Sequence, residues 1–326
     1  MKNARKILGY GLLIALVGLL GVTWWQKQQL ADWLALRSYQ APTDVSQLTG
    51  DATMTSSARR LFYINHPQLQ GRTEFNQSCT DKSEQSVVLG CYHGDRQGIF
   101  LYQITDARLQ GVMQVTAAHE MLHQAYDRLS SAERKRIDGL LEAFYAHGLT
   151  DPMVKEQLNV YKKTEPSALD NEMHSLFGTE VASLPPALET YYQRYFANRA
   201  RVVAYNTAYQ SEFTKRKDQV AAYDVQLAQL KEVIAANEHS LDTQQSTLKQ
   251  LKAQLDSESS SNDVDAYNAG VATYNRLAQT FNQQLAATRQ RIGQYNAIVE
   301  QRNAIAVQEQ QLQQALDSRL TPVGGQ

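Results

Sequence analysis

The last third of the chain carries two long series of hydrophobic residues spaced seven apart, and this pattern restricts the region to long helices. The first series comprises Val220, Leu227, Ile234, Leu241, Leu248 and Leu255. The second comprises Val264, Val271, Ala278, Leu285, Ile292 and Val299. Heptads sustained over this many repeats predict a coiled coil. The polar segment 257–262 between the two series is too short for anything but a reversal, so an antiparallel hairpin is expected over residues 198–320, with a frayed tail at 321–326.

Within this hairpin we expect Leu255 to lie near Val264, and Val220 to lie near Val299. The helical pattern also extends back from the first series to Pro186, and we interpret it as one continuous helix. The predicted boundary with the preceding domain lies near residue 198, where Gln and Asn become abundant.

The segment HEMLH, residues 119–123, lies inside a second helical pattern that spans residues 111–129. Four positions apart on a helix, His119 and His123 project from the same face and can bind one metal ion. Zinc lowers the pKa of a bound water towards about 7, and a neighbouring carboxylate, here Glu120, can then take its proton. Because most neighbouring positions are apolar, this helix is expected to be buried, where unpaired His and Glu side chains would be costly. The sequence therefore predicts a zinc site.

A catalytic zinc needs a third protein ligand and an open position. The candidates lie near a predicted helix over residues 164–178, with Thr164 as its N-cap. Side chains two positions apart on a helix diverge, so Glu172 and His174 are not expected to bind the same ion. The residues alone leave Glu172, His174, Glu165 and Glu180 as candidates.

With the motif at 119–123, the segment Asn171-Glu172-x-x-Ser175 resembles the second motif of the gluzincins, the zinc peptidases with a thermolysin-like site. Bacterial membrane-anchored proteins with the same order of motifs look similar, and the resemblance covers about residues 54–196. It implies a zincin-like fold and Glu172 as the third zinc ligand. The family's following Asp is replaced by Leu176, which leaves Asp170 or Glu180 to orient a ligand His. It also implies an oxyanion-stabilising residue, for which the candidates are His174, Tyr161 and Tyr126.

Residues 85–92 and 98–104 are rich in β-branched and aromatic residues and predict a β-hairpin. Zincins place an edge strand beside the zinc helix, and Ile99–Ile104 is the candidate for pairing with a substrate backbone. Further helices are predicted to start at Ser130, with Glu133 completing a capping box, and at Asp151 with Pro152. The fold class expected for residues 51–197 is therefore α+β, mainly α.

The N-terminal residues and the two cysteines indicate the cellular compartment of the chain. Uncharged residues 7–25 follow three basic residues and match the thickness of a bilayer core, so residues 1–26 are predicted to be a single-pass transmembrane anchor, with a cleaved signal peptide as the alternative. Residues 27–50 are interpreted as a juxtamembrane linker. The positive residues place the remaining chain outside the cytoplasm, where Cys79 and Cys91 are expected to form a disulfide.

These features favour an enzyme: a membrane-anchored, extracytoplasmic zinc metalloendopeptidase with Zn²⁺ held by His119, His123 and Glu172, Glu120 as general base, and a protein or peptide as substrate. The alternative is a non-catalytic interaction protein of the cell envelope, which binds a partner through the coiled coil and carries a degenerate zinc domain. The net charge of −1 without a basic cluster gives no support to nucleic-acid binding.

Overall fold

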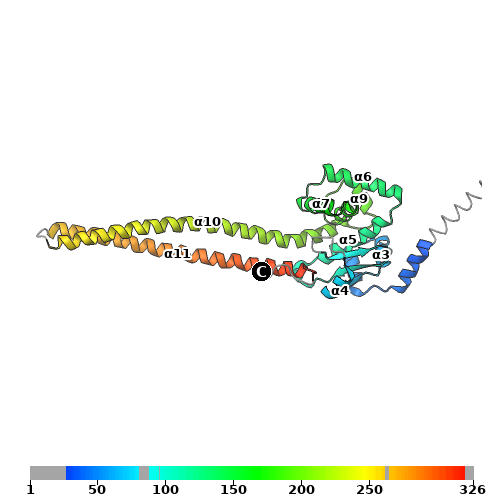
Figure 1. Ribbon diagram of the computed structural model, residues 1–326, viewed down its shortest axis with the longest axis horizontal. Helices are drawn as coiled ribbons and strands as arrows, with labels where there is room; N and C mark the ends of the chain where they lie inside the picture. Colours follow the sequence, from blue (N-terminus) through cyan, green and yellow to red (C-terminus); the bar gives the residue numbers. More distant parts are fainter. Residues whose placement is uncertain (1–26, 81–87, 95, 261–263, 320–326) are drawn as a thin grey trace, which may run out of the picture. The chain divides into compact units, whose positions relative to one another are not determined.

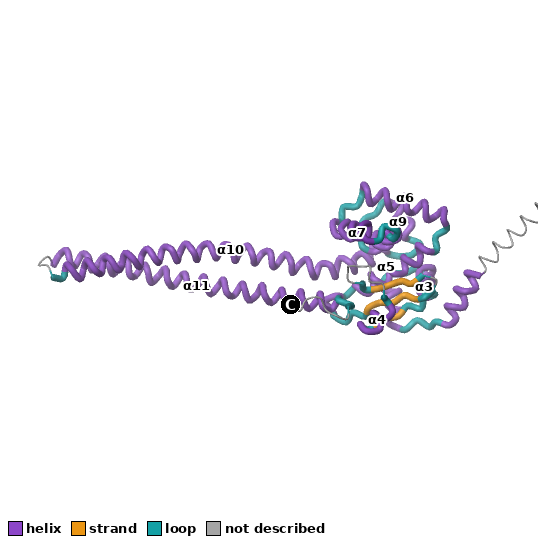
Figure 2. The backbone as a smooth tube through the Cα atoms, in the orientation of Figure 1, coloured by secondary structure: helices purple, strands orange, loops and turns teal. Residues whose placement is uncertain are grey.

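The chain is mainly helical with one small sheet, which confirms the expected α+β class (Figure 2). The computed structural model describes residues 27–80, 88–94, 96–260 and 264–319. It divides into two compact units: Met1–Glu212 together with Leu312–Gln326, here called the site unit, and Phe213–Gln311, here called the two-helix unit. The site unit thus includes the residues after 198 that begin the first long helix, and the residues that end the second.

The sheet has three strands in the order β1-β3-β2, with β1 at Gln68–Gln70, β2 at Gly90–His93 and β3 at Gly98–Tyr102. Strand β1 runs parallel to β3, and β2 runs antiparallel to it. The predicted hairpin is therefore present, but its second strand is not an edge strand. Because β1 pairs with the other side of β3, the sheet edge on the hairpin side is β2, and the prediction of Ile99–Ile104 as the edge is wrong.

The rest of the site unit is mainly helical. Residues 27–38 are helical. The following helices are α2 (Thr43–Asp51), α3 (Ser56–Tyr63), α4 (Arg72–Ser78), α5 (Val112–Asp127), α6 (Ser131–His147), α7 (Pro152–Thr164), α8 (Leu169–Thr179) and α9 (Pro186–Tyr192), with a 3-10 turn η1 at Ala107–Leu109.

The predicted helix starts are confirmed at the two positions where a side chain caps the helix. The Ser130 hydroxyl accepts from the Glu133 backbone N–H at 3.3 Å, and Asp151 accepts from two backbone N–H groups at the start of α7. The start predicted at Thr164 is wrong, since Thr164 is the last residue of α7 and α8 begins at Leu169 without a side-chain cap.

Helix α5 lies at the centre of the site unit and packs against α8, α3, α2 and the sheet. It begins after Gly111, whose φ of 100° lies in the left-handed region, and a Cβ there would lie 2.9 Å from the Tyr205 carbonyl oxygen. The surrounding core includes Phe62, Ile99, Leu101, Met121, Leu122, Phe177 and Tyr192, all fully buried. Each such side chain contributes about 1.5–3 kcal/mol on burial, so the core holds α5 and α8 firmly together.

The continuous helix predicted from Pro186 is interrupted. Helix α9 ends at Tyr192, and the long helix α10 (Arg199–Glu258) begins only after a turn. The guanidinium of Arg199, which is 7% exposed, donates to the carbonyl oxygens of Phe177 and Val181 and pairs with Glu189. This buried pairing fixes the bend, and heptad spacing cannot indicate it.

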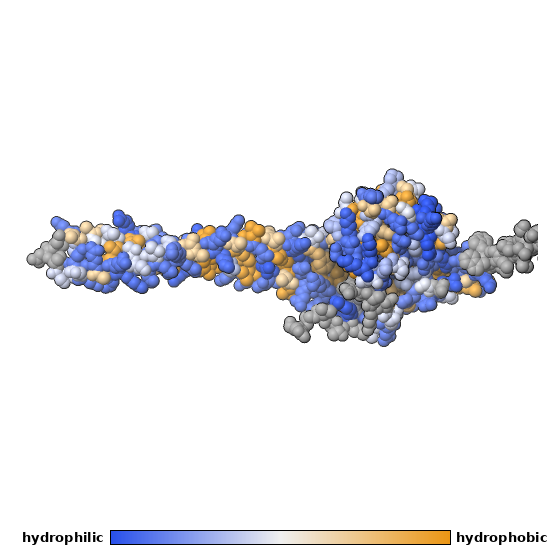
Figure 3. All heavy atoms as spheres, turned by 45° about the horizontal axis from the view of Figure 1, so that its top comes forward, coloured by the Kyte–Doolittle hydropathy of each residue, from blue (hydrophilic) through white to orange (hydrophobic). Residues whose placement is uncertain are grey.

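The two-helix unit contains most of α10 and most of α11 (Val264–Leu316), which lie side by side (Figure 1). The pair is antiparallel, because Arg302 bonds Asp224 at 2.6 Å, Gln244 bonds Gln284, and a Cβ on Gly270 would meet Leu255. Since Asp224 is already opposite Arg302, Val220 comes opposite residues after Arg302, and the predicted pairing with Val299 is out of register. Hydrophobic residues also gather on the surface of this unit (Figure 3), where Val225 and Val233 are exposed.

The predicted membrane anchor needs a correction. No helix in the described part of the chain is both long and apolar enough to cross a bilayer. The predicted span, residues 7–25, lies outside the described residues, as does the tail at 321–326. The single-pass anchor, and the extracytoplasmic placement that depended on it, therefore have no support in the described residues and are not carried further.

Candidate metal centre

Helices α5 and α8 bring three potential metal ligands together. His119 and His123 lie one turn apart on α5, and Glu172 lies in the first turn of α8. The His119 Nε2 and His123 Nε2 atoms are each 3.6 Å from an oxygen of the Glu172 carboxylate. One ligand atom from each residue lies within 4.8 Å of the other two. The predicted ligand set therefore converges on one point.

The hydrogen-bond partners of His123 set the orientation and the tautomer of its neutral ring. Its Nδ1 is 3.0 Å from the Asn171 amide oxygen and 3.3 Å from the Ser175 hydroxyl. Because an amide oxygen only accepts, the proton of a neutral ring lies on Nδ1, and Nε2 directs its lone pair towards Glu172. A metal-binding histidine needs this tautomer. Asn171, rather than Asp170 or Glu180, is therefore the residue that orients His123.

Glu172 is 7% exposed, and within the described part of the chain its buried Oε2 atom has no hydrogen bond, with His119 Nε2 3.6 Å away. Burial raises the pKa of this carboxyl, but His123 and His119 lower it more, so the net direction is downwards and the group is ionised at neutral pH. A buried carboxylate of this kind needs positive charge beside it, which a protonated histidine or a bound metal ion supplies.

The distances from the two histidines to Glu172 are close to the spacing of ligand atoms around a zinc ion. Tetrahedral zinc with ligands at about 2.0–2.2 Å places its ligand atoms about 3.4 Å apart. The observed Nε2–carboxylate distances of 3.6 Å are close to this value. Within the described ranges no fourth His, Cys, Asp or Glu joins the cluster, and three protein ligands are typical of catalytic rather than structural zinc.

The cluster lies in a cleft of about 400 Å³. One wall is the edge strand β2 with the two residues before it, another is α5, and the rest comes from α7, α8 and the first turns of α10. Glu120 lines this cleft next to His119 and is 6% exposed. A Cβ on Gly90 of β2 would lie 2.6 Å from Thr116 Cγ2 and 2.7 Å from Glu120 Oε1, so a side chain at this position would displace both residues.

The three candidates for oxyanion stabilisation differ in whether they reach the cleft. Tyr161 lines the cleft. Tyr126 does not, and its hydroxyl donates to Asp138 at 2.9 Å. His174 is fully buried on the other side of α8, where its Nε2 lies 2.8 Å from the Tyr191 hydroxyl. Burial lowers the pKa of His174 to about 3. The predicted catalytic role of His174 therefore has no support in the geometry, because the ring does not reach the cleft.

The remaining acidic candidates lie near the cluster without joining it. Glu165 and Glu180 line the cleft, and burial raises the pKa of Glu180 to about 7. Asp170 is not part of the cleft wall, and burial, followed by the charges of Asp138 and Glu142, raises its pKa.

The predicted disulfide between Cys79 and Cys91 is present, with the two Cα atoms 6.0 Å apart. It joins the end of α4 to β2, and both cysteines line the cleft. Sequence reasoning missed the contribution of β2 to the cleft and that of Tyr209 from α10. No local signal in the sequence indicates these contacts, since they depend on the packing of distant segments.

Comparison with protein-family models, with curated proteins and with solved structures gave no match.

Proposed function

We propose that this chain is a zinc metallopeptidase with a gluzincin-like site, which hydrolyses peptide bonds in a protein or peptide substrate. One observation above all supports the proposal. The Nε2 atoms of His119 and His123 each lie 3.6 Å from an oxygen of the buried Glu172 carboxylate, so two imidazole nitrogens and one carboxylate meet at one point. Two histidines and one glutamate are a ligand set that catalytic zinc ions take.

His119, His123 and Glu172 would hold the zinc, while Asn171 and Ser175 keep the ring of His123 in place. When bound, the ion supplies positive charge that polarises a substrate carbonyl and acidifies water.

Glu120 is the proposed general base. Its carboxylate takes the proton of the water whose oxygen attacks the carbonyl carbon, and returns that proton to the amide nitrogen as the C–N bond breaks. Its place in the same cleft as the three ligands supports this role. Tyr161, on the α7 wall of the cleft, is the proposed hydrogen-bond donor to the carbonyl oxygen as negative charge develops on it.

In this proposal strand β2, rather than Ile99–Ile104, pairs with the substrate backbone. Among the described strands it pairs with β3 alone, it is antiparallel to the rest of the sheet, and it forms a wall of the cleft. An extended peptide would add to its free edge as a further strand. A sheet edge beside the helix that carries the zinc ligands supports a zincin-like domain.

The two-helix unit is proposed to be an antiparallel coiled coil that binds a protein partner. The two heptad series support this, as do the paired contacts of Asp224 with Arg302 and of Gln244 with Gln284.

The test is peptide cleavage by the full chain and by Glu120→Gln. The amide has almost the same shape but cannot take a proton, so zinc content should be unchanged while turnover falls by about 10²–10⁴-fold. Glu165→Gln is the matched control, because it makes the same change in the same cleft and should keep most activity. Residual Glu120→Gln activity above about a hundredth of the wild type would refute the general-base role. Zinc binding without cleavage of any peptide would favour the interaction protein.

A further inference from the structure

The chain returns to the site unit after the two long helices. Helix α11 ends at Leu316, and residues 312–319, here called the C-terminal clasp, belong to the site unit. Within the clasp Leu312 is fully buried and Ser318 is 4% exposed. These two buried residues anchor the segment in the site unit, while Gln313, Gln314 and Arg319 are exposed.

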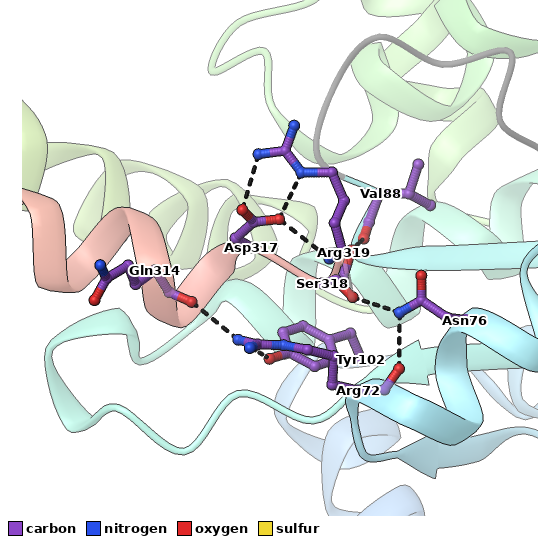
Figure 4. Close-up of polar contacts among 8 residues, drawn as sticks. All are labelled: Arg72, Asn76, Val88, Tyr102, Gln314, Asp317, Ser318 and Arg319. Atoms are coloured by element: carbon purple, nitrogen blue, oxygen red, sulfur yellow. Dashed lines mark hydrogen bonds and ion pairs between the residues drawn. The ribbon is translucent and has the colours of Figure 1, made fainter. Parts of the chain in front are cut away.

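The clasp makes three hydrogen bonds to other parts of the site unit (Figure 4). The Arg72 guanidinium on α4 donates to the Gln314 carbonyl oxygen at 3.2 Å, and the Asn76 amide on the same helix donates to the Ser318 carbonyl oxygen. The Ser318 hydroxyl donates to the Val88 carbonyl oxygen at 2.6 Å. Ser318 therefore links α4 to the chain just before β2.

Val88 lies two residues before β2 and itself lines the cleft. Strand β2 has four residues and pairs with a described strand on one side only. The Cys79–Cys91 disulfide ties its second residue to the end of α4, and Ser318 ties the residues before it to the middle of α4. These two links hold the strand against α4 at different points.

The Asp317 and Arg319 side chains stabilise the turn that presents Ser318. The Arg319 backbone N–H and guanidinium both donate to Asp317, with the guanidinium at 2.7 Å (Figure 4). The Ser318 side chain is buried in the site unit, whereas its neighbours Asp317 and Arg319 keep more of their surface exposed.

We propose that the C-terminal clasp positions strand β2 for substrate pairing, with Ser318 as the positioning residue. The inference rests on the proposed peptidase function, because it assigns the substrate to the free edge of β2. A short edge strand opens locally at low free-energy cost, and a strand held in its binding conformation loses less entropy when a peptide pairs with it. Val88 and Ser318 are 230 residues apart, so the substrate-binding strand depends on the far end of the hairpin.

Ser318→Ala in the full chain tests the proposal by hydrogen exchange. Loss of one buried hydrogen bond should speed exchange of the residue 90–93 amides about five- to tenfold, while exchange in α5 and α8 and the zinc content stay unchanged. In peptide cleavage KM should rise by a similar factor with little change in kcat, because the metal ligands and Glu120 are untouched. The matched control is Ser259→Ala, since the Ser259 hydroxyl makes an exposed hydrogen bond at the end of α10. It should leave every readout unchanged.

Unchanged exchange in β2 would overturn the proposal. Faster exchange to the same degree throughout the site unit would also overturn it, because the clasp would then only stabilise the fold. Exchange and zinc content do not need catalysis. If the wild type cleaves no peptide but Ser318→Ala still loosens β2 alone, the positioning role stands and the peptidase assignment fails.

Discussion

Asn171→Ala should weaken zinc binding without removing any ligand. The Asn171 amide oxygen accepts a hydrogen bond from His123 Nδ1–H, with the oxygen and the nitrogen 3.0 Å apart. This bond fixes both the tautomer and the orientation of the ring. Loss of such a partner costs about 10–100-fold in metal affinity, which corresponds to about 1.4–2.7 kcal/mol. Because the Ser175 hydroxyl remains 3.3 Å from the same nitrogen, the single variant should lie near the lower limit. The double variant with Ser175→Ala should lie near the upper limit.

Competition with a chromogenic zinc chelator at constant pH measures these affinities. Asn159→Ala is the matched control, since this amide also accepts one hydrogen bond, from the Tyr145 hydroxyl, but lies on the exposed surface of α7. Its zinc affinity should equal that of the wild type. If the double variant binds zinc as tightly as Asn159→Ala does, the reasoning on the tautomer of His123 is refuted.

Three further predictions follow from the geometry. His174→Ala should keep its zinc but lose about 1–3 kcal/mol of stability in chemical denaturation, because the buried Tyr191 hydroxyl loses a partner; loss of zinc would show that His174 belongs to the centre. Gly90→Ala should reduce peptide turnover with zinc retained, because the new methyl displaces Glu120; turnover equal to the wild type would contradict the close approach. Cysteines at Asp224 and Arg302 should crosslink within one chain, as seen by electrophoresis of dilute protein, more readily than cysteines at Val220 and Val299; the reverse preference would restore the register first expected.

The sequence could predict those parts of the site that one helix determines. His119, Glu120 and His123 owe their placement to helical periodicity and to apolar neighbours that bury α5. The motif around Glu172 indicated the segment of the third ligand, although its helix begins five residues later than Thr164 suggested. The disulfide was expected because the chain has two cysteines and both lie in the part predicted to be exported.

Features that depend on packing between distant segments could not be predicted. Strand β1 has the sequence QLQ and lacks the β-branched and aromatic residues that indicate strands, so the order of the sheet was misjudged. His174 lies two positions after Glu172, and a helix buried all round offers two different environments at that spacing. His174 lies in the environment away from the cleft, where its partner is Tyr191 of α9. The clasp joins Ser318 to Val88, and no local pattern in either segment predicts that contact.

The measurement that tests the central claim most directly is the metal content of the purified full chain, determined by mass spectrometry before and after dialysis against zinc. We predict one zinc per chain in the wild type and none in His123→Ala, with both proteins folded by circular dichroism. A folded wild type that remains free of zinc after dialysis, or a His123→Ala variant that binds zinc as well as the wild type, would contradict the assignment of this metal centre.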